Sequence, residues 1–233
     1  IRIKTIRRTG EGLSGNFSAA YRQGHEHYEN ANVSLNYRLQ NGMDFFVRGY
    51  LTDNNTRTTS TTDVQLQASS IWNYLKDKEY SYHMKYYFAD LGWNWEINDH
   101  HSVGFTYTAN DYIGNRKYIN SSDEQTWQDG IMVDSGHSTT TTLTKPKLKH
   151  SANAYYVGEI GKWKVDFSAD YYIAHSLSEM NGGTDGEAPV SSKTATKNQL
   201  VAEKLVVTAP LSVGELTFGE EASAVDRTSD FTQ

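Results

Sequence analysis

Histidines and aspartates are the side chains of this sequence whose spacing could support metal binding or catalysis. His25 and His27 flank Glu26, and an i, i+2 pair on a strand points to one side, as metal ligands can. No third or fourth ligand accompanies the pair in the sequence, which favours solvated loop histidines. Asp166 and Asp170 lie on one face of a predicted strand, about 13 Å apart at the rise of a strand. That separation is too long for a retaining glycosidase and wide for an inverting one. We therefore expect no enzymatic activity, no metal site and no cofactor.

Alternation of apolar and polar residues predicts the strands that carry these side chains. In residues 31–39 every odd position is apolar and every even position is polar, and residues 163–171 repeat the pattern. Side chains of a strand alternate between two faces, so each of these segments has one apolar and one polar face. The pattern recurs through most of the chain. It predicts an all-β fold, an antiparallel up-and-down meander.

The alternation also predicts which side chains share a face, because a register slip of one residue would exchange the two faces. The expected apolar face includes Leu35, Tyr37, Val47, Phe105, Phe167 and Ile173. The expected polar face includes Asn36, Arg48, Thr106, Asp166 and Ser168.

Composition narrows the class of protein. The chain has 233 residues, enough for one all-β domain, with 3 Pro and no Cys, which excludes disulfides, thiol catalysis and thiolate metal sites. Mean hydropathy is −0.68 and no apolar run is long enough for a transmembrane helix. The net charge of −6 argues against nucleic acid as a partner. The 16 Tyr and 5 Trp suit a boundary between lipid and water, and they suit a sugar-binding sandwich equally well.

The lengths of the connections separate these alternatives. Four are tight, at residues 41–42, 98–101, 159–162 and 212–215, and Asn-Gly at 41–42 predicts a type I′ hairpin. Long polar connections alternate with them, at 52–80, 111–149 and 177–197. In a meander this places all tight turns at one end, which is typical of an outer-membrane β-barrel with short periplasmic turns and long extracellular loops.

Parity of the turns then gives nine strands. Two tight turns at one end are separated by an even number of strands, so residues 43–97 form one outgoing and one returning strand. Residues 64–74 and 80–87 extend these strands beyond the membrane and are joined near 75–79. Trp93, Trp95 and Trp163 lie close to tight turns, and we expect them to cluster at that end of the sheet. An odd strand number, an opening without Met and the absence of an apolar leader lead us to expect a piece of a longer protein.

Several segments resemble a TonB-dependent outer-membrane receptor of the kind abundant in Bacteroides-like bacteria. Residues 1–8, IRIKTIRR, are similar to the end of the plug domain of such a receptor, and residues 12–21, GLSGNFSAAY, to its first barrel strand. The most characteristic stretches are AYY at 154–156 and GKWKVDFSADYY at 161–172. The resemblance covers nearly the whole chain and consists of strand patterns rather than invariant motifs.

The resemblance implies a full receptor of about 22 strands around a plug. It implies residues 1–11 as the end of the plug and 12–233 as a partial barrel in the outer membrane of a Gram-negative cell. The function implied is TonB-dependent import of a scarce nutrient, with lipid, the plug and an inner-membrane energising complex as partners. The energising box and the second half of the barrel are lacking, so we expect no transport by this segment alone, and self-association through its open edges.

A receptor of this kind binds its ligand in the lumen, on the polar face. The candidates for ligand contact are Arg48, Tyr50, Asp166, Asp170 and Tyr172. We expect Arg48 and Lys164 to balance the two aspartates.

Two other classes stay open at this point. A soluble lectin-like carbohydrate-binding β module would explain the Tyr and Trp content, and dependence on detergent distinguishes it from a barrel. An outer-membrane barrel enzyme would need convergent catalytic groups at its rim, which the sequence does not offer.

Overall fold

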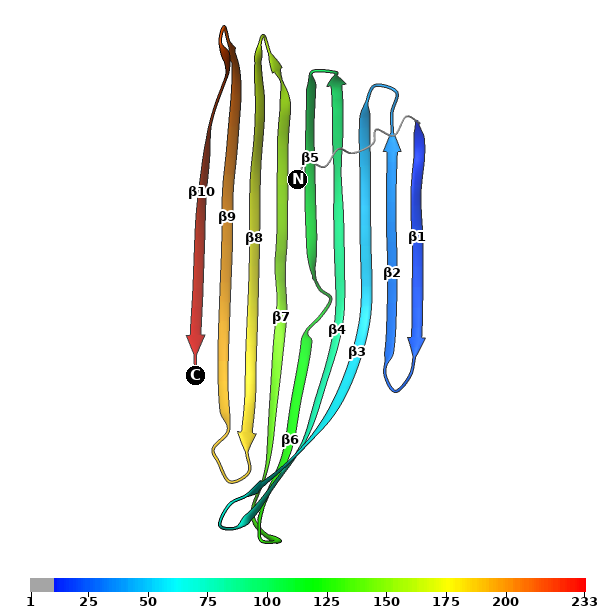
Figure 1. The fold of residues 1–233 in the computed structure, drawn as a ribbon. Helices are drawn as coiled ribbons and strands as arrows, with labels where there is room; N and C mark the ends of the chain where they lie inside the picture. The colour runs from blue at the N-terminus through cyan, green and yellow to red at the C-terminus, as the bar shows by residue number, and fades with distance from the viewer. Residues whose placement is uncertain (1–10) are drawn as a thin grey trace.

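The computed structural model describes residues 11–233, and these form one antiparallel sheet without helices (Figure 1). The strands are β1 (Gly12–Gln23), β2 (His27–Arg38), β3 (Met43–Gln67), β4 (Ile71–Asn98), β5 (His101–Tyr112), β6 (Arg116–Gln128), β7 (Ile131–Ile160), β8 (Trp163–Thr184), β9 (Val190–Leu211) and β10 (Gly214–Thr232). The predicted all-β meander is confirmed. The plug assignment falls almost wholly on residues 1–10, outside the described residues.

Sequential neighbours pair throughout the sheet, with one variation. The order is β1-β2-β3-β4-β5-β7-β8-β9-β10, and β6 pairs with β4 and β7. Strands β5 and β6 thus lie end to end between β4 and β7, and Figure 1 shows the bend that separates them. Ten strands therefore occupy nine positions across the sheet. The nine predicted strands correspond to these positions.

Strand pairing confirms the two predicted faces. Directly opposed residues of an antiparallel pair lie on the same face. One continuous apolar row runs across the sheet through Leu35, Val47, Leu91, Tyr107, Ala152, Tyr171, Val201 and Ala224. The next row, on the opposite face, runs through Asn36, Phe46, Gly92, Thr106, Asn153, Asp170, Ala202 and Ser223.

The tight turns all lie at one end of the sheet, as predicted (Figure 1). Trp95 is opposite Met43, the first residue of β3, and its indole nitrogen donates to the Asn41 carbonyl at 3.1 Å. Trp163 opens β8, and its ring centroid is 6.2 Å from that of Phe218. The tryptophans near the tight turns therefore do gather at that end.

The Asn-Gly hairpin forms, but the predicted turn type is wrong. Gly42 has φ 79°, whereas Asn41 has no positive φ, so a type I′ turn is excluded. The loop spans four residues, and the Leu39 N–H donates to the Met43 carbonyl at 2.8 Å. The Asn41 side chain accepts from the Met43 N–H at 3.2 Å, which stabilises this wider turn.

The predicted long loops are wrong, because these segments continue the strands. Residues 52–67 belong to β3, and the turn to β4 lies at 68–70 instead of 75–79. Most of 111–149 forms β6 and the first part of β7, around a turn at Asp129 and Gly130. Most of 177–197 belongs to β8 and β9. Threonine-rich runs support these extensions, since β-branched residues favour strands even without apolar partners.

The sheet has no second layer within the described residues. Only Ala174, Val207 and Ala209 are buried hydrophobic residues there, and no large side chain is fully buried. Large apolar groups are instead open on one face, such as Phe17 at 72% and Val47 at 50% exposure. No helix in 11–233 is long and apolar enough to cross a membrane.

Candidate ligand-binding face

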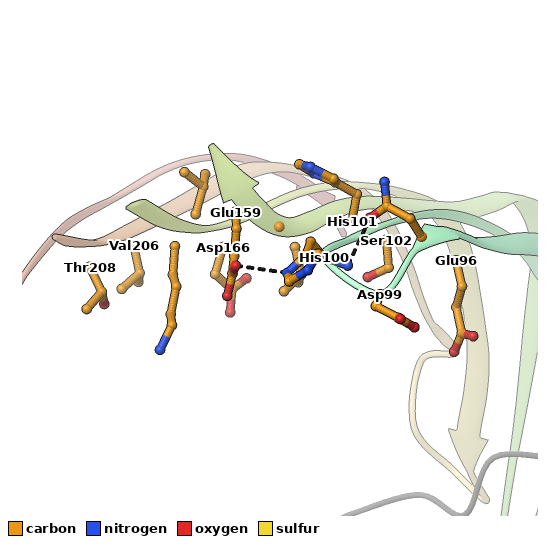
Figure 2. A pocket seen from close by; sticks show the side chains of 14 residues that line it. Glu96, Asp99, His100, His101, Ser102, Glu159, Asp166, Val206 and Thr208 are labelled. Carbon is orange, nitrogen blue, oxygen red and sulfur yellow. Dashed lines mark hydrogen bonds and ion pairs between the residues drawn. The ribbon is translucent and has the colours of Figure 1, made fainter. Parts of the chain in front are cut away.

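The polar face is the concave side of the curved sheet. Figure 2 shows Glu96, Ser102, Asp166, Val206 and Thr208 hanging from the inside of the arch, while His101 points outward. These inward residues line a cleft of about 470 Å³ beside the tight turns of β4–β5 and β7–β8. Alternation thus places the polar side chains inside the curve and the apolar ones on its convex outside.

Two histidines lie at the end of the sheet where this cleft is found, one on each face. The His100 ring nitrogen Nδ1 lies 2.9 Å from the Glu159 carboxylate, which joins the two tight turns (Figure 2). The His100 N–H donates to the Asn98 side chain at 2.9 Å. On the convex side, His101 Nδ1 is 2.7 Å from the Tyr156 hydroxyl.

The predicted site residues share the concave face but do not converge. Asp166 lines the cleft at the turns, whereas Asp170 and Tyr172 line a separate hollow of about 370 Å³. Arg48 and Tyr50 lie on β3, four positions across the sheet from β8, or about 19 Å at the usual strand spacing. Since alternation fixes a face and leaves the height and position across the sheet free, the five residues occupy three places.

The expected charge balance is wrong. The Arg48 guanidinium pairs with Asp90 on the neighbouring strand, and that carboxylate is only 3% exposed and also accepts from the Thr108 hydroxyl. Asp170 accepts from the Asn153 side chain at 2.8 Å. Lys164 lies 3.8 Å from Glu215. Arg48 and Asp170 find their partners directly opposite on adjacent strands, where residues of a sheet are closest, whereas the partner of Lys164 lies two strands away on β10.

The histidine pair of β1–β2 separates in the structure. His25 and Glu26 lie in the turn, and His27 begins β2. The His27 ring lies 3.0 Å from the Asn55 amide and 3.9 Å from the Asp53 carboxylate.

Six tyrosines form two trios on the concave face, which together we call the tyrosine wall. Its members are Tyr50, Tyr80, Tyr82, Tyr86, Tyr112 and Tyr118. Tyr86 joins one trio, with ring centroids 6.1 Å from Tyr50 and 5.6 Å from Tyr112. Tyr118 joins the other, at 5.9 Å from Tyr80 and 5.6 Å from Tyr82. These spacings are those of packed aromatic pairs.

Arg116 links the two trios. Its guanidinium carbon lies 4.8 Å from the ring centre of Tyr112 and 4.3 Å from that of Tyr118, and it donates to the Tyr112 hydroxyl. The Lys149 ammonium lies 5.6 Å from the centre of the Tyr112 ring. Two cations therefore sit against neutral aromatic surface.

Irregular backbone places Arg116 there. The ladder breaks between β5 and β6 at residues 113–115, where Gly114 has φ 74°. The facing strand β7 has its own register shift between Pro146 and Lys149. Bulges of this kind re-aim side chains and recur beside binding sites.

Sequence reasoning missed the tyrosine wall in part because Tyr112 and Tyr118 fall in 111–149, which was expected to be a loop. Tyr80, Tyr82 and Tyr86 fall in 80–87, which was expected to be a strand extension. The available signal was alternation: Tyr80, Tyr82 and Tyr86 occupy even positions of one strand, and Tyr112 and Tyr118 occupy even positions of its neighbours. Burial raises the pKa of Tyr80 and of Tyr118, so both phenols stay neutral at physiological pH. The wall offers ring faces, hydroxyl groups and positive charge.

No protein-family model matches this sequence, and no curated protein matches it. Among solved structures it is similar to BauA, the ferric preacinetobactin receptor from Acinetobacter baumannii, with 11% identity and a TM-score of 0.35 over 93% of this chain. The chain spans 41% of that receptor's length. It is also similar to the Pseudomonas putida toluene transporter TodX, with 8% identity and a TM-score of 0.25 over 94% of this chain and 86% of the transporter. Similarity this low does not identify a function. An inference about function must rest on the chemistry of the two faces of the sheet.

Proposed function

We propose that this chain is part of the wall of an outer-membrane β-barrel receptor, with its convex face against lipid and its concave face toward water. The observation that carries the proposal is the convex face itself. It is apolar over a limited height, has no covering layer within the described residues, and ends at polar residues on strand after strand.

The height of this apolar band matches a membrane. On β4 the convex positions are apolar from Tyr87 to Ile97, and the next one is Lys85. Eleven residues span about 33 Å along a strand at about 3.3 Å per residue, hence about 25 Å along the membrane normal for a strand tilted by about 40°. Outer-membrane barrels have an apolar band of about that height.

The far boundary of the band is charged. The Asp53 carboxylate lies 2.9 Å from both the Lys85 ammonium and the His83 ring. Convex residues at the corresponding boundary of other strands are Glu29, Asp111, His150, His175, Gln199 and Asp226. Tryptophans occupy the opposite boundary, as they do at membrane interfaces.

The band also crosses the strands obliquely. Its polar boundary moves toward the tight turns by two residues from Lys85 to Asp111 and by two more to His150. It moves back by two at His175 and is level with His150 again at Gln199 and Asp226. The tight turns move the same way, and Figure 1 shows them rising from β2–β3 to β9–β10. Such a stagger results when strands tilt relative to the axis of a barrel.

We extend the proposal to TonB-dependent uptake of a nutrient. What supports this step is the resemblance of residues 12–21, 154–156 and 161–172 to a receptor of that class, together with a polar concave face that could line a lumen. The concave face supplies the ligand contacts, and a plug and an inner-membrane complex supply closure and energy.

Cysteine labelling tests which face meets lipid, because the natural chain has no Cys. Tyr171 and Tyr172 are adjacent, lie on opposite faces and are 38% and 39% exposed, which makes them a matched pair. In cells that express the protein from its own reading frame, Y172C should react with a water-soluble maleimide. Y171C and the mid-band variant L91C should react only with a membrane-soluble maleimide.

Equal reaction of all three cysteines with the water-soluble reagent, in protein that needs no detergent, would contradict the proposal. That result would favour the lectin-like module. Rapid labelling of L91C and slow labelling of Y172C by the water-soluble reagent would mean that the convex face meets water and the concave face does not.

A further inference from the structure

Arg116 is a cation without a carboxylate partner in the described residues. Its guanidinium contacts two ring faces and one tyrosine hydroxyl, and its Nε atom is buried without a hydrogen-bond acceptor. A guanidinium has five N–H donors, so most of its hydrogen-bonding capacity is unused here. An uncompensated donor in a partly buried site is costly unless a further acceptor arrives.

The neighbouring acids do not compensate this charge. On the same face, Asp90 is paired with Arg48 and Glu124 is paired with the Lys76 ammonium at 2.5 Å. Lys149 adds a second positive charge beside the Tyr112 ring, and the buried Asp111 carboxylate nearby offsets part of it. Arg116 therefore gives the tyrosine wall a positive charge that no carboxylate of the described residues pairs with, and the neutral phenols of Tyr80 and Tyr118 do not repel an anion.

The arrangement of the tyrosine rings also favours a ligand that contains a ring. Tyr112 and Tyr118 hold the guanidinium between them, and their neighbours continue the aromatic surface in both directions. Flat surfaces of this kind stack with planar aromatic groups and with the C–H faces of sugar rings. A carboxylate on the same molecule could reach the bidentate fork of the arginine.

The geometry points to the tyrosine wall as a binding site for small ring-bearing carboxylates, with the ring on the tyrosines and the carboxylate on Arg116 and Lys149. This inference deepens the proposed function, since a concave face toward water makes the wall accessible. The trio of Tyr80, Tyr82 and Tyr118 lies beyond the charged boundary of the apolar band, so the site would meet a ligand before it reaches membrane depth.

Calorimetry on the protein purified in detergent tests the site with defined probes. Benzoate represents an aromatic carboxylate and glucuronate a sugar carboxylate, while benzyl alcohol and acetate each lack one of the two features. We expect one ring-bearing carboxylate to bind at least about tenfold more tightly than both partial probes. The ring that binds identifies the source of the shared chemistry.

Variants locate the binding. R116Q should weaken binding by about tenfold or more, Y118L should also weaken it, and R116K should restore part of it because the charge remains. K149Q should have a smaller effect of about threefold. R57Q is the matched control, since Arg57 lies on the convex face of the same sheet and is paired with Glu79 at 2.5 Å; it should bind like the natural protein.

Failure to bind either ring-bearing carboxylate would overturn the inference, as would equal binding by R116Q and R57Q. Hydrogen exchange of β4 and β6 amides shows whether each variant keeps its ladder, and K149Q and R116K test the site if R116Q does not fold. The cysteine labelling is independent of binding. Labelling as expected without binding overturns only this inference, and binding with inverted labelling overturns only the proposed function.

Discussion

The two halves of the β3–β4 hairpin have the same backbone and different surroundings. In the half near the tight turns, convex positions of β3 such as Phe45, Val47 and Leu51 are apolar. In the far half the convex positions are Asp53, Asn55, Arg57, Thr59 and Thr61. The ladder nevertheless continues without interruption from Met43 opposite Trp95 to Gln67 opposite Ile71.

This contrast shows that strand formation and apolar alternation have different causes, although both contribute to the pattern in the sequence. Backbone hydrogen bonds and β-branched side chains are sufficient to continue a strand once its hairpin has formed. Apolar alternation reports something else, namely the medium on the convex face. Alternation ends where the proposed membrane ends, and the strand does not.

The strongest way to break the comparison is to charge the convex face in both halves. L91R places a cation in the middle of the apolar band and should destabilise the protein in lipid vesicles by about 2–4 kcal/mol. T59R places the same side chain opposite Glu79 in the far half and should change stability by less than about 0.5 kcal/mol. Urea unfolding in vesicles measures both values.

Similar costs for the two arginines would contradict the difference between the halves. A large loss of stability for T59R alone would mean that lipid contacts the far half of the hairpin.

Turns at the two ends sharpen the comparison with a smaller effect. Gly42 has φ 79°, and a Cβ there would lie 2.6 Å from the Glu96 carbonyl oxygen. Gly130, at the far end, has φ 81° and open space around it. G42A should cost about 2–3 kcal/mol, from strain plus the clash, and G130A about 1 kcal/mol from strain alone. The same unfolding experiment compares the two variants. Equal losses of stability would show that the turn at Gly42 accommodates a Cβ as readily as the turn at Gly130.

The smallest effect concerns acid. The Lys145 ammonium, 2.8 Å from Glu179, donates to that carboxylate and is the main reason that the pKa of Glu179 lies below its usual value of 4.5. A lowered folded pKa means that the stabilisation is present above pH 4.5 and is lost as pH falls through the folded pKa. Hydrogen exchange in the far half of β7–β8 should therefore accelerate below pH 4.5 in the natural protein.

The control for this acid effect is E179Q, in which exchange of these amides should be faster at neutral pH and should accelerate less on acidification. An unchanged acid response in E179Q would assign the loosening to another group.

Much of the near half could be predicted from the sequence. Leu35, Val47 and Phe105 share a face as alternation requires, and the end with tight turns is correct. The strand extensions could not be predicted in the same way, because residues 52–63 and 139–142 are polar on both faces and resemble loops. Only pairing with a partner strand distinguishes them from loops, and a single sequence does not show that partner.

The candidate site was harder to predict for a related reason. Arg48 was correctly placed on the concave face, but its partner Asp90 is more than forty residues away along the chain. Alternation places Arg116 on the same face as Tyr118, but its position beside Tyr112 depends on the break at 113–115, which the sequence does not show. Partners across a sheet depend on register, which tight turns determine near one end and which irregularities alter toward the other.

The break between β5 and β6 has a consequence for how the protein tolerates changes in length. One residue inserted within β5 would exchange its lipid-facing and water-facing side chains from that point onward. At residues 113–115 the ladder is interrupted and only the Ile113 N–H still donates to the Lys85 carbonyl of β4, so an added residue at 114–115 could be absorbed locally. The far hairpins could therefore grow or shrink over evolution, and new outer surfaces could be tried, without disturbing the part of the sheet that contacts lipid.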